Sequence, residues 1–154
     1  MAFAKVLADT NVLVDYLSKR EPFCQDARLL MIAANVGDVE LWLCASQLTD
    51  LVYILSDGGK PALMAETLER LRVLRSFARI APVDSWCVDR MLASTWEDPE
   101  DALVNEVALQ IRADCIVTRD VYLQQRASCP AFDCAGFLAW FEKITDIAYT
   151  ELPV

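Results

Sequence analysis

The order of apolar and polar residues along the chain predicts short strands that alternate with helices. Short, almost continuously apolar runs predict strands at 5–9 (KVLAD), 40–44 (ELWLC), 79–83 (RIAPV), 114–118 (DCIVT) and 131–133. Between the strands, apolar residues recur three or four positions apart, which is the spacing of one helix face. The predicted helices cover residues 11–18, 23–36, 46–56, 61–78, 84–94, 98–111 and 135–144. Continuously apolar strands that alternate with helices are typical of a parallel sheet covered on both faces.

Prolines and capping residues refine these boundaries. Pro82 lacks a backbone N–H, so the strand that contains it is predicted to lie at an edge of the sheet. Pro22 is expected at the start of the second helix. Ser46 is expected to cap the third helix, because its hydroxyl can accept a backbone N–H. No repeat or linker divides the chain, so residues 1–154 are predicted to form one domain.

Composition excludes several classes of protein. The chain has 154 residues, 55% of them hydrophobic, and only four glycines, which suits a globular core rather than a disordered chain. No apolar run approaches the roughly 18 residues of a membrane helix. The opening residues, MAFAKVLADTN, include Lys5 and Asp9, which leaves no room for the apolar core of a signal peptide. We therefore predict a cytoplasmic protein.

The chain has no histidine and six cysteines, and this restricts its chemistry. A Ser-His-Asp or Cys-His nucleophile cannot be built without histidine. No two cysteines form a CxxC pair, which argues against a structural zinc site. Most cysteines lie among apolar residues, as in DCIVT and LWLCAS, and are predicted to be reduced and buried. Any hydrolysis must therefore rely on carboxylates, hydroxyls, lysine or a bound metal.

Charge is distributed unevenly along the chain. The net charge is −9 and the isoelectric point is near 4.4, whereas phosphate binding favours a basic surface. Residues 60–79, however, hold five basic and two acidic side chains. The arginines of this segment are either a contact for an RNA backbone or members of helical ion pairs, such as Glu66–Arg70 and Glu69–Arg72. The second interpretation is the one we expect.

Aspartates follow several of the predicted strands. Asp9 ends the first strand, and Asp120 follows the DCIVT strand by two residues. Asp101 lies in the first turn of the helix before that strand, and Asp50 in the first turn of the helix after ELWLC. Ligands of parallel sheets bind at the carboxyl ends of strands, so these side chains are predicted to share one rim. Simpler roles stay open: Asp9 as a helix cap, Asp101 as a partner of the helix dipole and Asp120 as a loop residue.

Asp50 differs from the others, because its helix is apolar on nearly every side and is therefore predicted to be buried. No Lys or Arg lies in that helix, so a buried Asp50 would need a metal ion or a distant basic residue. Carboxylates on one rim repel one another and raise their pKa values, and a divalent cation relieves that repulsion. Oxygen ligands favour Mg²⁺ or Mn²⁺. Such a site suits phosphodiester hydrolysis, because the cation activates water and neutralises phosphate charge.

Several segments, taken in order, resemble the PIN-domain family of nucleases, which includes VapC-type ribonuclease toxins. They are ADTNVLVDYL (8–17), SQLTDLVYIL (46–55), EDPEDALVNEVA (97–108) and IVTRD (116–120), and FLAWFE (137–142) resembles the family's last helix. The resemblance implies a three-layer α/β/α sandwich with a central, mainly parallel sheet. It also implies an endoribonuclease that depends on Mg²⁺ or Mn²⁺.

The resemblance assigns catalytic and metal-binding roles to Asp9, Asp50, Asp101 and Asp120. The second family position usually holds glutamate, and Asp50 is one methylene shorter. Asp98, three residues before Asp101, is a rival metal ligand. Hydroxyls near the metal are expected from Thr10, Ser46 and Thr118. Arg119 is expected, from its position alone, to contact a phosphate.

The predicted function is a metal-dependent ribonuclease that hydrolyses RNA phosphodiester bonds, either alone or as a toxin paired with an antitoxin protein. A mean hydropathy of +0.27 and four tryptophans predict an exposed apolar patch and hence a homodimer. One alternative is a catalytically weak PIN-like module that binds RNA or a protein partner, as the acidic charge and Asp50 suggest. Another is a phosphatase or receiver-like domain phosphorylated on Asp9, although Asn11 stands where such phosphatases usually have a second acid.

Overall fold

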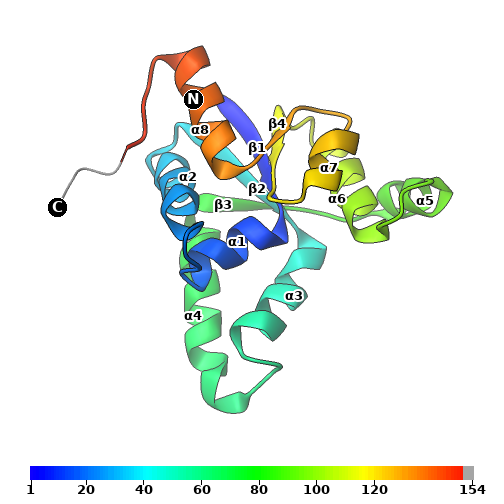
Figure 1. Cartoon of the computed structure of the whole chain (residues 1–154). Coiled ribbons are helices and arrows are strands. Elements are labelled where there is room, and N and C mark those ends of the chain that lie inside the picture. The colour runs from blue at the N-terminus through cyan, green and yellow to red at the C-terminus, as the bar shows by residue number, and fades with distance from the viewer. Residues whose placement is uncertain (151–154) are drawn as a thin grey trace.

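The computed structural model describes residues 1–150, which form a parallel sheet with helices on both faces (Figure 1). The elements are β1 (Ala4–Ala8), α1 (Thr10–Leu17), α2 (Cys24–Val36), β2 (Val39–Cys44), α3 (Ala45–Leu55), α4 (Pro61–Phe77), β3 (Ala78–Ala81), α5 (Ser85–Ala93), α6 (Pro99–Gln110), β4 (Cys115–Val117), α7 (Val121–Arg126), β5 (Ala131–Phe132) and α8 (Cys134–Thr145). The strand order is β3-β2-β1-β4-β5, and every pair is parallel. The predicted α/β sandwich is confirmed.

Two hydrophobic cores, one on each face of the sheet, hold the layers together. Along β1, Val6 belongs to one core and the next residue, Leu7, to the other. The larger core lies beneath α1, α2, α4 and α8 and includes the fully buried Phe137. The smaller core lies beneath α5, α6 and α7 and includes Val107 and Leu123. Because both faces are covered, the strands are apolar on both sides, which explains their continuously apolar runs.

The strand predictions hold to within a residue or two, and Pro82 follows β3, which is an edge strand as expected. One helix was not predicted: α7 is short and has Leu123 as its one buried residue, so it shows no apolar period. The helix predicted at 23–36 is α2, which begins one residue later, at Cys24. Pro22 precedes it in a turn, where the backbone N–H groups of Phe23 and Cys24 both donate to the carbonyl of Arg20.

The start of α3 also differs from the prediction. Its N-cap residue is Cys44, not Ser46, and Ser46 is exposed. The side chain of Gln47 explains the difference. The backbone N–H of Cys44 donates to Gln47 Oε1 at 2.7 Å, and Gln47 Nε2 donates to the carbonyl of Ala8 at 3.1 Å. A buried amide therefore joins the start of α3 to the end of β1.

The basic segment at residues 60–79 is a solvated face rather than a free cationic patch. Each of its arginines contacts a neighbouring acid or carbonyl: Glu66–Arg70, Glu69–Arg72, Arg75 to the carbonyl of Ala78, and Glu40–Arg79. The two ion pairs predicted from the sequence are thus present. Exposed pairs of this kind contribute little to stability.

The six cysteines are reduced, as predicted, and four of them are buried. Burial raises the pKa of the Cys44 thiol to about 12, so it is neutral at physiological pH. Within residues 1–150, no helix combines the length and the apolar character that crossing a membrane would require.

Candidate active site

An open cleft lies at the carboxyl ends of β1 and β4, which are neighbours in the sheet. The cleft is lined by Asp9, Thr10, Asn11, Val14, Arg20, Ile54, Asp98, Glu100, Asp101 and Asp120. Asp9 directly follows β1 and Asp120 follows β4, while the other acids come from the start of α6. The structure therefore brings Asp9, Asp101 and Asp120 to one rim, together with the rival Asp98.

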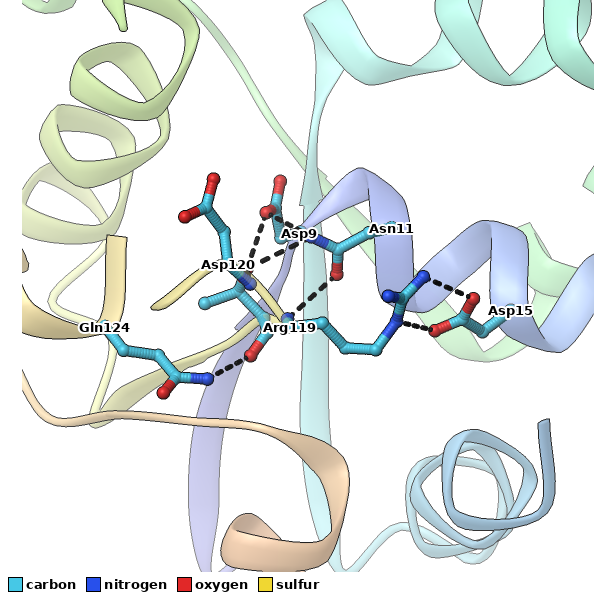
Figure 2. Close-up of polar contacts among 7 residues, drawn as sticks. Asp9, Asn11, Asp15, Arg119, Asp120 and Gln124 are labelled. Carbon is cyan, nitrogen blue, oxygen red and sulfur yellow. Dashed lines mark hydrogen bonds and ion pairs between the residues drawn. The ribbon is translucent and has the colours of Figure 1, made fainter. Parts of the chain in front are cut away.

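Asp9 is held by hydrogen bonds from three groups. The backbone N–H of Thr10 donates to Oδ1 at 2.8 Å. The other oxygen, Oδ2, accepts from Asn11 Nδ2 at 3.0 Å and from Thr118 Oγ1 at 2.7 Å; Figure 2 shows Asn11 beside Asp9. Asp9 is also the N-cap residue of α1, so the simpler role considered for it is filled as well. Burial raises its pKa, and the charges of Asp120 and Asp98 add to that rise, against the opposing effect of the hydrogen bonds.

Asp101 is the least satisfied carboxylate of the cleft. It is 6% exposed, and its buried Oδ2 has no hydrogen-bond partner among the described residues. Burial and repulsion from Asp120, Asp98 and Asp9 raise its pKa to about 7. A buried carboxylate oxygen without a partner is costly, so this position calls for a cation or a shared proton.

Asp120 and Asp98 both cap helices while they line the cleft. Oδ1 of Asp120 accepts the backbone N–H of Tyr122 at 2.8 Å and that of Leu123 at 3.3 Å, at the start of α7. Oδ1 of Asp98 accepts the backbone N–H of Glu100 at 2.8 Å, at the start of α6. These bonds fix the carboxylates in place and leave a second oxygen on each.

Asp50 is exposed, whereas it was predicted to be buried. On α3 only Gln47 and Leu51 are buried, whereas Tyr53 is 65% exposed and Asp50 is exposed, so the prediction of a buried helix was wrong. The reason is that α3 and α4 extend away from the sheet as a pair (Figure 1). Asp50 does not line the cleft, although its charge helps to raise the pKa of Glu100, after the larger effect of burial. Ser46 does not line the cleft either.

Of the other predicted hydroxyls, Thr10 lines the cleft, whereas Thr118 is not among its lining residues and contacts Asp9 instead. Thr118 is fully buried; its hydroxyl donates to Asp9 and accepts from Asn11 Nδ2 at 3.2 Å and from the backbone N–H of Asp120 at 3.0 Å. The Oγ1 of Thr10 is buried without a partner among the described residues. Thr118 thus joins the two strand-end aspartates, and Thr10 leaves an oxygen near them.

Arg119 forms an ion pair with an acid of α1, and its expected contact with a phosphate stays a prediction. Its Nε and Nη2 donate to the two carboxylate oxygens of Asp15 at 2.6 and 3.0 Å, and its guanidinium lies 4.0 Å from the centre of the Phe23 ring. Figure 2 shows the side chain extending along α1 to Asp15, away from Asp9 and Asp120. The backbone N–H of Arg119 donates to Asn11 Oδ1 at 3.1 Å.

Three further residues line the cleft that were not predicted as site residues: Asn11, Glu100 and Arg20. Asn11 had a signal, because it belongs to the DTN motif and follows the strand-end aspartate by two residues. Glu100 also had one, since it lies between Asp98 and Asp101. Arg20 had no local signal, because it reaches the cleft only through the turn after α1.

The donor set of the cleft fits a hard divalent cation. All candidate ligands are oxygens, and the carboxylates are crowded enough to raise one another's pKa values. As they are arranged in residues 1–150, no three acidic or cysteine side chains lie close enough together to hold an ion. The unpartnered Oδ2 of Asp101 nevertheless marks a place where a cation would offset a buried charge.

Comparison with known proteins assigns the family. The model of the PIN domain matches residues 5–122, a span that includes all four predicted acids. The chain therefore belongs to the PIN domain family, whose members are typically nucleases. The resemblance drawn from the sequence motifs is confirmed.

Solved structures share the fold at low sequence identity. A chain of FitAcB from Neisseria gonorrhoeae has a TM-score of 0.65 and 17% identity, with 84% of this chain and 98% of that chain covered. A chain of VapBC2 from Rickettsia felis, bound to a promoter DNA fragment, has a TM-score of 0.61 and 16% identity, with 82% of this chain and 96% of that chain covered. A chain of DNA-bound VapBC from Salmonella typhimurium has a TM-score of 0.61 and 16% identity, with 85% of this chain and 98% of that chain covered. No curated protein sequence matches this chain.

Proposed function

We propose that this protein is an endoribonuclease that hydrolyses RNA phosphodiester bonds with the aid of Mg²⁺ or Mn²⁺. The observation that carries the proposal is Asp101, a buried carboxylate with an unpartnered oxygen among Asp9, Asp98 and Asp120. Such a group costs stability unless a cation joins it. Membership of a family that typically consists of nucleases supports the same conclusion.

The residues that would hold the cation are Asp9, Asp101 and Asp120, with Asp98 as a further ligand. A bound cation would lower the pKa of a coordinated water and neutralise charge on the phosphate. The protein contributes orientation: Thr118 and Asn11 hold one oxygen of Asp9, and the N-terminal amides of α7 hold one oxygen of Asp120. Carboxylates oriented before the substrate arrives need less reorganisation during the reaction.

Activity as the toxin of a toxin–antitoxin pair is part of the proposal. Support comes from the similar chains, which belong to complexes described as VapBC and FitAB. The protein partner would then be an antitoxin. A homodimer in the cytoplasm remains our prediction from hydropathy and composition.

RNA cleavage by the purified protein tests the proposal. A labelled, mixed-sequence single-stranded RNA is incubated with Mn²⁺ and one of three proteins: the wild type, Asp9→Asn or Asp89→Asn. The Asp89→Asn variant is a matched control, because Asp89 is an exposed aspartate of α5. We expect cleavage by the wild type and by Asp89→Asn, and none by Asp9→Asn or in EDTA. Cleavage by Asp9→Asn at the wild-type rate would refute the carboxylate mechanism.

A catalytically weak module that binds RNA or a protein partner is the second candidate, and the position of Asp50 favours it. Asp50 is exposed and is not among the residues that line the cleft, although its charge contributes to the raised pKa of Glu100 there. If this candidate is correct, the folded wild type binds the RNA without cutting it. Restoration of the usual family residue by Asp50→Glu would then be expected to produce cleavage.

A further inference from the structure

The acidic cleft contains a single basic side chain. Of the described residues that line it, five are acidic and Arg20 alone is basic. The net charge of the whole chain is −9, so the field around this cleft opposes the approach of a polyanion. A substrate phosphate that enters the cleft therefore has few protein cations to meet.

The backbone of Arg20 is fixed, whereas its side chain is exposed. The N–H of Arg20 donates to the carbonyl of Asp15 at 3.0 Å, and its own carbonyl accepts from Phe23 and Cys24 at 3.0 and 2.7 Å. These bonds hold the turn that follows α1 against the cleft. In the part of the chain that the structure describes, no ion pair or hydrogen bond engages the guanidinium. Arg20 thus presents an uncompensated charge from a well-anchored position.

Arg119 provides the contrast. It is adjacent to Asp120 in sequence, but its Nε and Nη2 already donate to the two carboxylate oxygens of Asp15. The ring of Phe23 packs against its guanidinium. Withdrawing Arg119 for a phosphate would leave Asp15 buried and unpaired, at a high energetic cost. Arg20 carries no such penalty, because it has no partner to lose.

We propose that Arg20 binds a non-bridging oxygen of an RNA phosphate beside the scissile bond, an assignment that rests on the proposed ribonuclease function. The planar guanidinium suits phosphate oxygens and can donate two parallel hydrogen bonds. Arg20 lies on the rim of the cleft, so it acts on substrate binding and register. It is a substrate-binding residue that favours a negatively charged RNA strand over a neutral ligand.

Single-turnover cleavage at rising enzyme concentration tests the assignment. The variants are Arg20→Gln, Arg20→Lys and the control Lys19→Gln, which removes the same charge one residue away, where Lys19 borders a different groove with Tyr16 and Arg70. The probe is the labelled single-stranded RNA with Mn²⁺, and melting curves confirm that each variant is folded. The measured quantities are the half-saturating enzyme concentration, its salt dependence and the maximal rate.

We expect Arg20→Gln to raise the half-saturating concentration about tenfold and to change the maximal rate by less than about threefold. The slope of the logarithm of the binding constant against the logarithm of the salt concentration should become shallower by roughly 0.7. This is the contribution of one contact to a phosphate of a single strand. Arg20→Lys should lie between the wild type and Arg20→Gln, and Lys19→Gln should match the wild type.

Two failures are distinguishable. If the wild type cuts the RNA but Arg20→Gln has the same half-saturation and salt slope as Lys19→Gln, the assignment of Arg20 is wrong and the ribonuclease stands. If the folded wild type cuts no RNA with Mn²⁺, the proposed function is overturned and the assignment with it.

Discussion

Two buried aspartates, Asp15 and Asp101, lie beside the consecutive residues Arg119 and Asp120 and differ in their hydrogen-bond partners. Arg119 pairs with Asp15, whose two oxygens both receive charged hydrogen bonds. Asp120 lies beside Asp101, whose Oδ2 receives none, and the repulsion between them contributes to a raised pKa. One buried acid is thus paired within the chain, whereas the other has an oxygen without a hydrogen-bond partner and a raised pKa. The paired acid supports the fold, whereas the unpaired one lowers stability at a place where a ligand can recover it.

Removing the unpaired charge should have the largest effect on function. We predict that Asp101→Asn lowers the rate of RNA cleavage by at least about 100-fold, because it removes a negative ligand from the cation site. The same change should leave the melting temperature without cation unchanged or higher, since a repelled charge is lost. Cleavage assays and thermal melts in EDTA measure both effects. A variant that melts well below the wild type would show that Asp101 is a structural residue.

Removing the paired charge should have the opposite consequence for stability. We predict that Asp15→Asn destabilises the protein by about 2–3 kcal/mol, because it leaves the Arg119 guanidinium, itself partly exposed, without its carboxylate. For a chain of this size the melting temperature should fall by roughly 5–10 °C.

The Asp15–Arg119 interaction itself is isolated by a double-mutant cycle. Asp15→Asn combined with Arg119→Gln should cost clearly less than the sum of the two single changes, as measured by urea unfolding. Strict additivity would mean that the two side chains do not interact in solution.

The pH dependence of stability should reveal the raised pKa of Asp101. The pKa of Asp101 is raised from its ordinary 3.8 to about 7, so the folded state retains a proton that the unfolded state has lost. The stability that this raised pKa contributes is complete below pH 3.8 and is lost as the pH rises through 7. In EDTA, the melting temperature of the wild type should therefore fall more between pH 5 and 8 than that of Asp101→Asn. Parallel curves for the two proteins would contradict the raised pKa.

An exposed ion pair should show the smallest effect on stability. Glu69 and Arg72 lie on the surface of α4, 3.1 Å apart and each 68% exposed. We predict that Glu69→Gln changes the stability by less than about 0.5 kcal/mol and leaves RNA cleavage unaltered. A loss comparable with that of Asp15→Asn would mean that burial is not what distinguishes these pairs.

Much of this arrangement follows from the local sequence. Continuously apolar runs identified the strands, and a strand that ends in an acid placed Asp9 at the rim of the sheet. The start of α6 was visible in Asp98-Pro99, because an aspartate cap before proline is a common way to begin a helix. The resemblance to the family drew attention to Thr118, whose hydroxyl donates to Asp9 in the structure; its predicted place near a metal stays a prediction.

What could not be predicted depends on contacts between distant segments. The apolar period of α3 is the same whether its outer face is covered or projects into solvent, and so the predicted burial of Asp50 was wrong. Arg119 and Arg20 look alike in the sequence, since nothing local shows that Asp15 neutralises the first and leaves the second free. Position along the chain identified which acids meet, but the partners of the arginines are decided by tertiary packing.

The central claim is that the charge of Asp101 is left unpaired so that it can bind a divalent cation. Titration of Mn²⁺ into the folded protein by calorimetry tests this directly, with the wild type, Asp101→Asn and Asp89→Asn compared at pH 8. We predict that Asp89→Asn binds Mn²⁺ as the wild type does and that Asp101→Asn binds it at least about tenfold more weakly. Equal Mn²⁺ affinity for Asp101→Asn and the wild type would contradict it.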